Sequence, residues 1–343
     1  FQRHIIKFKQ IEYRDALDII RDVEEILGAN NKDHKSTLVE LLKKGVVIHH
    51  GSVPLEVRYL VERFIKLGFA RICFATSTLA QGINMPFDIV WLANMRMYGE
   101  SEQKRCLAFK NLIGRSGRLS KDKSFDYGYV YTQNAQLLTT RVKTSFKLEE
   151  KSVLEEPIDI DNDNHELVKS IVEGTFNDDI NLPLSKIERL KSHSCTVALR
   201  KILDTLFDGG FGHSIIGSKN KETRQQVKYE LLTIYEASLG RALFQGEQNV
   251  FNTAIEIIFH VMAGRSFKEI VGLRYSYISN REREGDGLSR FSQPANKLPD
   301  SNLVKPYSLF HSVQPIDVSY DTIVFDTYDY LDTVISFSLS DVF

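Results

Sequence analysis

The chain has 343 residues, of which 42% are hydrophobic and 26% charged, and its formal net charge at pH 7 is −1. This length is sufficient for two domains, and the near-zero net charge excludes attraction of nucleic acid by a global positive field, so such binding would need a local groove. The three cysteines form no Cys-x-x-Cys pair, and no apolar run approaches the roughly 20 residues of a membrane span. The sequence predicts a reduced cytoplasmic protein with no membrane partner.

Residues 1–146 alternate apolar runs with segments of helical periodicity. One such segment repeats apolar residues from Val57 to Phe64 and places Arg58, Glu62 and Arg63 on the opposite face. Near-continuous apolar strands between helices predict an α/β fold, with a parallel sheet covered by helices on both faces. Strands are predicted at 4–8, 46–50, 71–75, 88–92 and 127–131.

The pattern changes after residue 146. Residues 147–166 are predicted to be an acidic linker, and residues 167–343 a mainly helical domain with an irregular loop near 281–302. Ser266 and Glu269 have the spacing of a capping box. The β-branched and aromatic segment from about residue 316 predicts no definite fold. Helices are predicted at 164–174, 184–207, 222–240, 248–263 and 266–279.

Several motifs resemble ligand sites but fail on spacing. Residues 212–219 approach a phosphate-binding loop, but the Ser and Lys are in the wrong order. The acids from Asp159 to Asp163 begin like a calcium loop, yet Asn164 stands where glycine is needed. His49 and His50 have no further ligand at zinc spacing. We therefore predict no metal site.

Two runs carry the main functional signal. Residues 74–86 form an apolar strand followed by a turn rich in threonine and serine, which offers hydroxyl and amide groups to phosphates. Residues 111–118 place Arg115 and Arg118 three positions apart with glycines between them. Planar guanidinium groups on a tightly turning backbone are suited to phosphate binding.

Residues 46–118 resemble the second RecA-like lobe of superfamily 2 helicases, most closely the superkiller-type, DExH-box branch. Three blocks carry the resemblance: His49-His50-Gly51 with Arg58 and Val61-Glu62 downstream, residues 75–86 as motif V, and residues 111–118 as motif VI. Asn111 departs from the usual glutamine, so no catalytic role is assigned to it. A fainter resemblance links the chain to helicases of bacterial anti-phage defence, of the Hachiman type.

The resemblance implies a nucleotide-binding role for part of motifs V and VI. Arg115 and Arg118 would be catalytic arginine fingers that reach the γ-phosphate of ATP. Gly114 would contribute to the same cofactor-binding site. Gly82 and Asn84 would couple it to the grip on nucleic acid.

A second group of residues is implied in nucleic-acid binding. His50, Gly51, Thr76, Ser77 and Thr78 would contact phosphates of a single strand of DNA or RNA. Such contacts do not depend on base sequence and weaken as salt increases. In a parallel α/β sheet, ligands bind at the carboxyl ends of strands, which is where several of these residues are expected.

The chain contains no GxxxxGK[ST] and no DExH or DEAD sequence. ATP with Mg²⁺ would therefore be bound mainly by a missing N-terminal RecA-like lobe of the same protein, and we expect the present fragment alone to be inactive. The leading hypothesis is the C-terminal part of an ATP-dependent helicase or translocase. The alternatives are a non-unwinding regulatory module that binds nucleic acid or a partner protein, and a translocase on duplex DNA.

Overall fold

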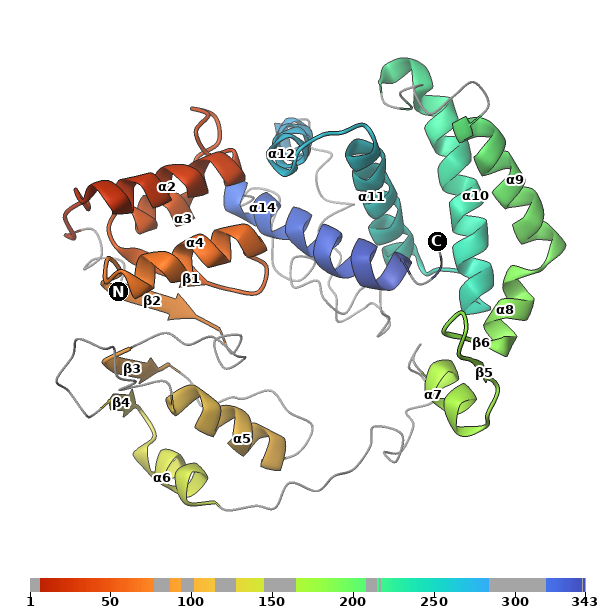
Figure 1. Ribbon diagram of the computed structural model, residues 1–343. Coiled ribbons are helices and arrows are strands. Elements are labelled where there is room, and N and C mark those ends of the chain that lie inside the picture. Colours follow the sequence, from red (N-terminus) through yellow and green to blue (C-terminus); the bar gives the residue numbers. More distant parts are fainter. Residues whose placement is uncertain are drawn as a thin grey trace. The chain divides into compact units, whose positions relative to one another are not determined.

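The computed structural model describes residues 7–76, 87–93, 102–114, 128–144, 165–207, 215, 217–283, 319–340 and 342. The chain divides into two compact units, residues 1–150 and 151–343 (Figure 1). Helices account for most of the described secondary structure in both units. None of the helices in these ranges is both long and apolar enough to cross a membrane.

The first unit begins with two helices that bury one apolar face. In α2 (Arg14–Leu27) the buried residues recur every three or four positions, and the helix ends at Gly28, whose φ of 70° is left-handed and favours glycine. Helix α3 (Thr37–Leu42) begins at Ser36, whose Oγ accepts a hydrogen bond from the amide of Val39 at 3.2 Å. The buried residues of α2 are Ala16, Ile19, Ile20, Val23 and Leu27.

Strands β1 (Val46–His49) and β2 (Ile72–Ala75) form a parallel pair, and α4 (Leu55–Lys66) connects them. Their register runs from Val46 opposite Ile72 to His49 opposite Ala75. Helix α4 buries Val57, Val61, Phe64 and Ile65 and packs beside α2 (Figure 1). The predicted strands at 46–50 and 71–75 are confirmed to within one residue at each end.

A second parallel pair joins β3 (Ile89–Leu92) to β4 (Tyr129–Thr132). Between them lies α5 (Glu102–Ile113), and α6 (Ala135–Lys143) follows β4. Lys110 of α5 donates a hydrogen bond to the carbonyl of Thr144 at 2.6 Å, just beyond the end of α6. The strand predicted at 127–131 is observed as β4 at 129–132, so its bounds are displaced by one or two residues.

The described residues do not show one RecA-like sheet. They form two separate two-stranded parallel sheets, β1–β2 and β3–β4. The predicted strand at 4–8 is not formed at Lys7 and Phe8, which lie in irregular backbone; residues 4–6 are outside the described residues. The parallel direction is thus confirmed, whereas the single covered sheet stays a prediction.

The second unit is mainly helical, as predicted. The segment predicted as one helix over 184–207 is interrupted at residues 191–192. Residues 281–283, assigned to an irregular loop, belong to a helix, and the rest of that loop lies outside the described residues, as does nearly all of the predicted linker. Its elements are α7 (His165–Val172), an antiparallel pair of β5 (Phe176–Asn177) and β6 (Leu182–Pro183), α8 (Leu184–Leu190), α9 (His193–Phe207), the 3₁₀ helix η3 (Ser218–Asn220), α10 (Lys221–Leu239), α11 (Gln245–Met262), α12 (Phe267–Arg283), α14 (Tyr320–Asp329) and the π-helix η7 (Tyr330–Leu339).

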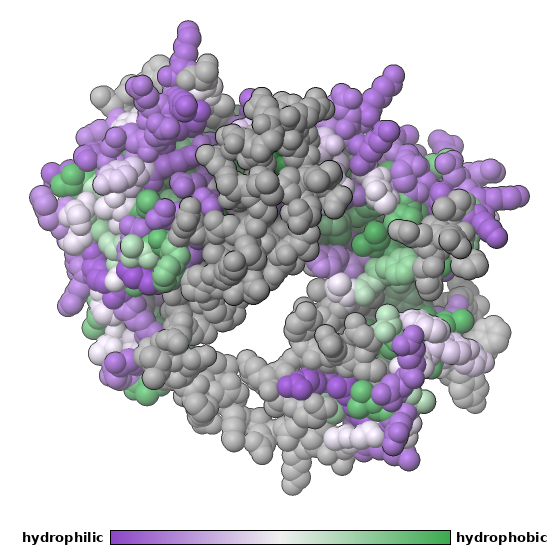
Figure 2. Space-filling model, turned by 180° about the vertical axis from the view of Figure 1, so that it is seen from behind, coloured by the Kyte–Doolittle hydropathy of each residue, from purple (hydrophilic) through white to green (hydrophobic). Residues whose placement is uncertain are grey.

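The core of the second unit lies among α9, α10, α11 and η7. Phe251, Ile255 and Phe259 of α11 are at most 2% exposed and pack with Tyr330 and Val334 of η7. On the face that Figure 2 shows, hydrophilic residues cover much of the described surface and hydrophobic residues form small patches between them. The β-branched C-terminal segment folds as the helix η7 because its apolar residues complete the core with α11.

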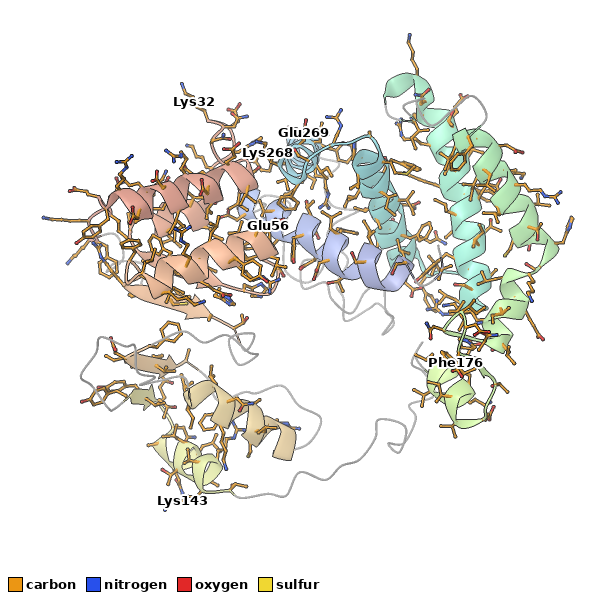
Figure 3. The ribbon with its side chains drawn as sticks, viewed as in Figure 1. Lys32, Glu56, Lys143, Phe176, Lys268 and Glu269 are labelled. Carbon is orange, nitrogen blue, oxygen red and sulfur yellow. The ribbon has the colours of Figure 1, made fainter. Side chains whose placement is uncertain are left out.

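The structure shows one half of the capping box predicted at the start of α12, in which the Glu269 side chain accepts the amide of Ser266. The amide of Ser266 donates to Oε2 of Glu269 at 2.8 Å, and Ser266 Oγ donates to the same oxygen at 2.7 Å. Glu269 is labelled in Figure 3. These hydrogen bonds, which stabilise the charged form, lower the pKa of the Glu269 carboxyl.

Candidate nucleic-acid interface

The carboxyl ends of β1 and β2 bring two of the predicted phosphate-binding positions together. Thr76 follows the last residue of β2, and its amide donates a hydrogen bond to the carbonyl of His49 at 3.3 Å. His50 follows His49 directly, so Thr76 and His50 leave the two strands at the same edge. Thr76 is exposed, whereas His50 is half-buried.

A compact turn connects β1 to α4. The amide of Ser52 donates to Nδ1 of His50 at 3.1 Å, and the amide of Val53 donates to the carbonyl of His50, also at 3.1 Å. Gly51 lies between these anchor points. Since Nδ1 accepts a hydrogen bond, the proton of the neutral His50 ring is on Nε2.

Burial keeps His50 neutral at physiological pH. Desolvation lowers the pKa of its ring, and the neighbouring His49 ring and the charge of Arg58 lower it further. The turn therefore presents a neutral imidazole, an N–H donor rather than a fixed cation, beside the end of β2.

His49 has a different environment from its neighbour. Its side chain is fully buried, and Nε2 lies 3.4 Å from Oε1 of Glu62 on α4. Desolvation lowers the pKa of His49 even though Glu62 acts in the opposite direction. The neutral ring therefore donates its Nε2 proton to the carboxylate, and His49 is too deeply buried to bind a ligand directly.

The helical periodicity misplaced Glu62. The sequence pattern put it on the face opposite the apolar residues of α4, but its side chain is only 12% exposed and points back to β1. Glu62 and the amide of Ser52 are the groups around this turn that sequence reasoning missed. The signal available was the presence of Glu62 in the same motif block as His49.

Gly114 is the described part of the predicted nucleotide site. It ends α5, where its amide donates to the carbonyl of Lys110 at 2.9 Å. A Cβ atom at this position would lie 3.1 Å from the same carbonyl oxygen, which is a tight contact. Gly82, Asn84, Arg115 and Arg118 lie outside the described residues, as do Ser77 and Thr78 from the nucleic-acid group.

Within the described ranges, no group of three or more His, Cys, Asp or Glu side chains is arranged to hold a metal ion. The three cysteines are free thiols, and Cys106 and Cys195 are buried. Burial raises the pKa of the Cys73 thiol to about 12, so this cysteine is unreactive at neutral pH.

Comparison with known proteins shows that part of this chain is similar to helicases. No family model matches the sequence. The chain is 35% identical over 99 residues to the Hachiman protein HamB of Bacillus cereus. The matched residues make up 29% of this chain and 9% of HamB. It is 33% identical over 103 residues to the ATP-dependent DNA helicase Hel308 of Pyrobaculum calidifontis, covering 29% of this chain and 14% of Hel308. It is 31% identical over 118 residues to the mouse exosome RNA helicase MTR4, covering 34% of this chain and 11% of MTR4.

These relatives confirm the resemblance to superkiller-type superfamily 2 helicases and to the Hachiman type. The similarity extends over about a third of the chain. It corresponds to less than a sixth of the length of each of these three relatives.

Proposed function

We propose that this chain is the C-terminal part of an ATP-dependent helicase or translocase and that its first unit contains the second RecA-like lobe. The observation that carries the proposal is the hydrogen bond from the Thr76 amide to the His49 carbonyl, which joins two motif blocks of the helicase resemblance at one strand edge. The names of the relatives, which include an ATP-dependent DNA helicase and an exosome RNA helicase, support this reading.

In this proposal the strand edge holds one strand of DNA or RNA by its phosphates. The Thr76 hydroxyl and the Nε2–H of His50 are hydrogen-bond donors, and Gly51 lets the backbone approach closely. Ser77 and Thr78, which follow Thr76 in the sequence, would supply further hydroxyl donors. Because the donors are neutral, they orient the strand more than they attract it, which agrees with a chain whose net charge is −1.

The proposed role in ATP hydrolysis rests on residues that follow Gly114 in the sequence. Arg115 and Arg118 would act as arginine fingers, since guanidinium groups stabilise the charge that develops as water attacks the γ-phosphate. Gly82 and Asn84 would transmit the nucleotide state to the strand edge. When bound, ATP with Mg²⁺ supplies the hydrolysable phosphate, held mainly by an N-terminal RecA-like lobe.

The Hachiman resemblance supports a role in anti-phage defence. A strand-displacement assay on the full-length protein separates the helicase from its alternatives. Unwinding supports the helicase, translocation without unwinding identifies a duplex translocase, and binding without either identifies a regulatory module.

Fluorescence anisotropy of a labelled 20-nucleotide DNA or RNA tests the strand edge. We expect Thr76→Val in the 343-residue chain to weaken binding by about threefold to tenfold, the net value of one ordinary hydrogen bond. Thr139→Val is the matched control, because Thr139 is an exposed threonine of α6 whose hydroxyl bonds only its own helix at Ala135. Equal affinity of the two variants would contradict the proposed interface.

A further inference from the structure

We propose that Glu62 is a positioning residue of this interface. Through the buried ring of His49, it holds the His50–Ser52 turn in register with Thr76. The proposal rests on the proposed function, because it assigns a role at the same strand edge. It adds a residue that binds neither nucleic acid nor nucleotide itself.

His49 is the junction through which Glu62 acts. Its carbonyl accepts the amide of Thr76 at 3.3 Å, its side chain reaches Glu62 at 3.4 Å, and its peptide bond continues into His50. Three elements, β1, β2 and α4, therefore meet at one residue. A displacement of His49 would therefore move the peptide that continues into His50 and that accepts the amide of Thr76.

Among side-chain hydrogen bonds, the structure gives the ring only the one to Glu62 within the described residues. Nδ1 of His49 is buried and has no hydrogen-bond partner among the described residues. Glu62 is thus the polar group that fixes the orientation of this imidazole. Without it, both ring nitrogens would be buried and unsatisfied, and the ring would be driven to reorient.

The charge of Glu62 makes the proposal distinguishable from a simple electrostatic effect. A carboxylate close to bound phosphates repels them, so charge alone predicts that neutralising Glu62 strengthens binding. Positioning predicts the opposite for any variant that loses the contact to His49. It predicts no change for a neutral variant that keeps the contact.

Three substitutions separate the two effects. Glu62→Gln keeps the length and a hydrogen-bond acceptor but loses the charge. Glu62→Asp keeps the charge but is one methylene shorter, and Glu62→Met keeps the length but loses the acceptor. Glu56→Met is the matched control, because Glu56 is an exposed glutamate in the first turn of the same helix (Figure 3).

The experiment measures the affinity of the folded 343-residue chain for the labelled 20-nucleotide strand at several salt concentrations, together with the thermal unfolding midpoint. We expect Glu62→Asp and Glu62→Met to bind about threefold to tenfold more weakly, and Glu62→Gln and Glu56→Met to stay within about twofold of the unsubstituted chain. The salt dependence stays the same in all variants, because none removes a cation that contacts phosphate. A long-range ¹H–¹⁵N spectrum should also show shifted ring nitrogens of His50 in the Asp and Met variants before any ligand is added.

Several outcomes overturn the proposal. Unchanged affinity of folded Glu62→Asp overturns it even if Glu62→Met does not fold, and so does tighter binding by Glu62→Gln. A loss of affinity that only follows the unfolded fraction shows a structural role alone. If the unsubstituted chain and Thr76→Val bind equally poorly, the proposed function itself fails, whereas an effect of Thr76→Val with none from Glu62 removes only the positioning role.

Discussion

At the end of β1, two histidines are adjacent in sequence but lie in different environments. His49 is wholly buried against Glu62, and His50 lies in the turn where its Nδ1 accepts an amide. For both rings, desolvation is the largest cause of a lowered pKa. Arg58 lowers both pKa values as well, and Glu62 raises only that of His49. The folded protein therefore favours the neutral form of each ring.

The lowered pKa values of the two rings predict how the stability of the fold depends on pH. In the unfolded chain these rings have a pKa near 6.5, so below that pH the unfolded state binds more protons than the folded state. The contribution is complete above about pH 6.5 and is lost as the pH falls through the lower folded pKa. Urea unfolding between pH 7.5 and 5 should show a falling unfolding free energy, with a smaller fall in His49→Phe. His260, whose pKa is also lowered by burial, adds a fall of the same sign that persists in this variant.

An equal fall in His49→Phe and the unsubstituted chain would contradict this prediction. The variant also removes the effect of His49 on the pKa of His50, so the difference in slope reports the titration of His49 together with its coupling to His50. Histidine ring signals followed by NMR across the same pH range would show the lowered pKa of His49 directly.

Single residues also show where sequence reasoning stops. The spacing of Val57, Val61 and Phe64 correctly predicts the buried face of α4. It does not predict Glu62, because periodicity reports which residues are apolar and not where a long polar side chain reaches. The hydrogen bond between the Ser266 amide and the Glu269 side chain was predictable for the opposite reason: its partners are three residues apart and need no tertiary information.

At the scale of elements, α14 and η7 show tertiary packing overriding local preference. The segment is β-branched and aromatic, which disfavours a helix and left its fold undefined in the sequence. It is nevertheless helical, with Ile323, Val324 and Val334 at most 4% exposed. Its anchor to α12 is Arg274, which pairs with the buried Asp326, donates to Thr327 Oγ1 at 2.6 Å and lies 5.0 Å from the ring centre of Tyr330.

This anchor predicts a large loss of stability when one partner is removed. Arg274→Met leaves the Asp326 carboxyl buried without its cation, and we expect the unfolding free energy to fall by about 3–5 kcal/mol. Asp326→Asn added to Arg274→Met should recover part of the loss, because the uncompensated charge is removed. Urea denaturation of the single and double variants measures both effects.

Arg200→Met is the control for this cycle, since Arg200 is an exposed residue of α9. We expect it to change stability by less than about 0.5 kcal/mol. A similar small effect of Arg274→Met would show that the pair does not anchor α14. Additive effects in the double variant would show that the two side chains do not interact in solution.

At the scale of the whole molecule, the sequence predicts the type and order of elements better than the way strands combine. Four of the five predicted strands are present, and the chain divides near residue 150 into an α/β unit and a helical unit. Ile89, Trp91, Tyr129 and Tyr131 lie on one face of β3–β4 and are 50–60% exposed. Strand periodicity is local, whereas the combination of strand pairs into one sheet depends on contacts between residues far apart in sequence, which no short pattern encodes.

The whole chain also determines what chemistry is available to it. Arginine fingers raise the rate of nucleotide hydrolysis by roughly 10³–10⁵, but only for a phosphate and metal that other residues already hold. The 343 residues contain neither the GxxxxGK[ST] loop nor the DExH box that would hold them. We therefore expect the purified chain to release no phosphate from ATP above background, with or without single-stranded nucleic acid, in a coupled phosphate-release assay. Arg118→Ala is the decisive variant: turnover by the chain that this substitution abolishes would show that a complete ATP site is present, and Arg118 would then act within this chain rather than on a nucleotide bound by another lobe.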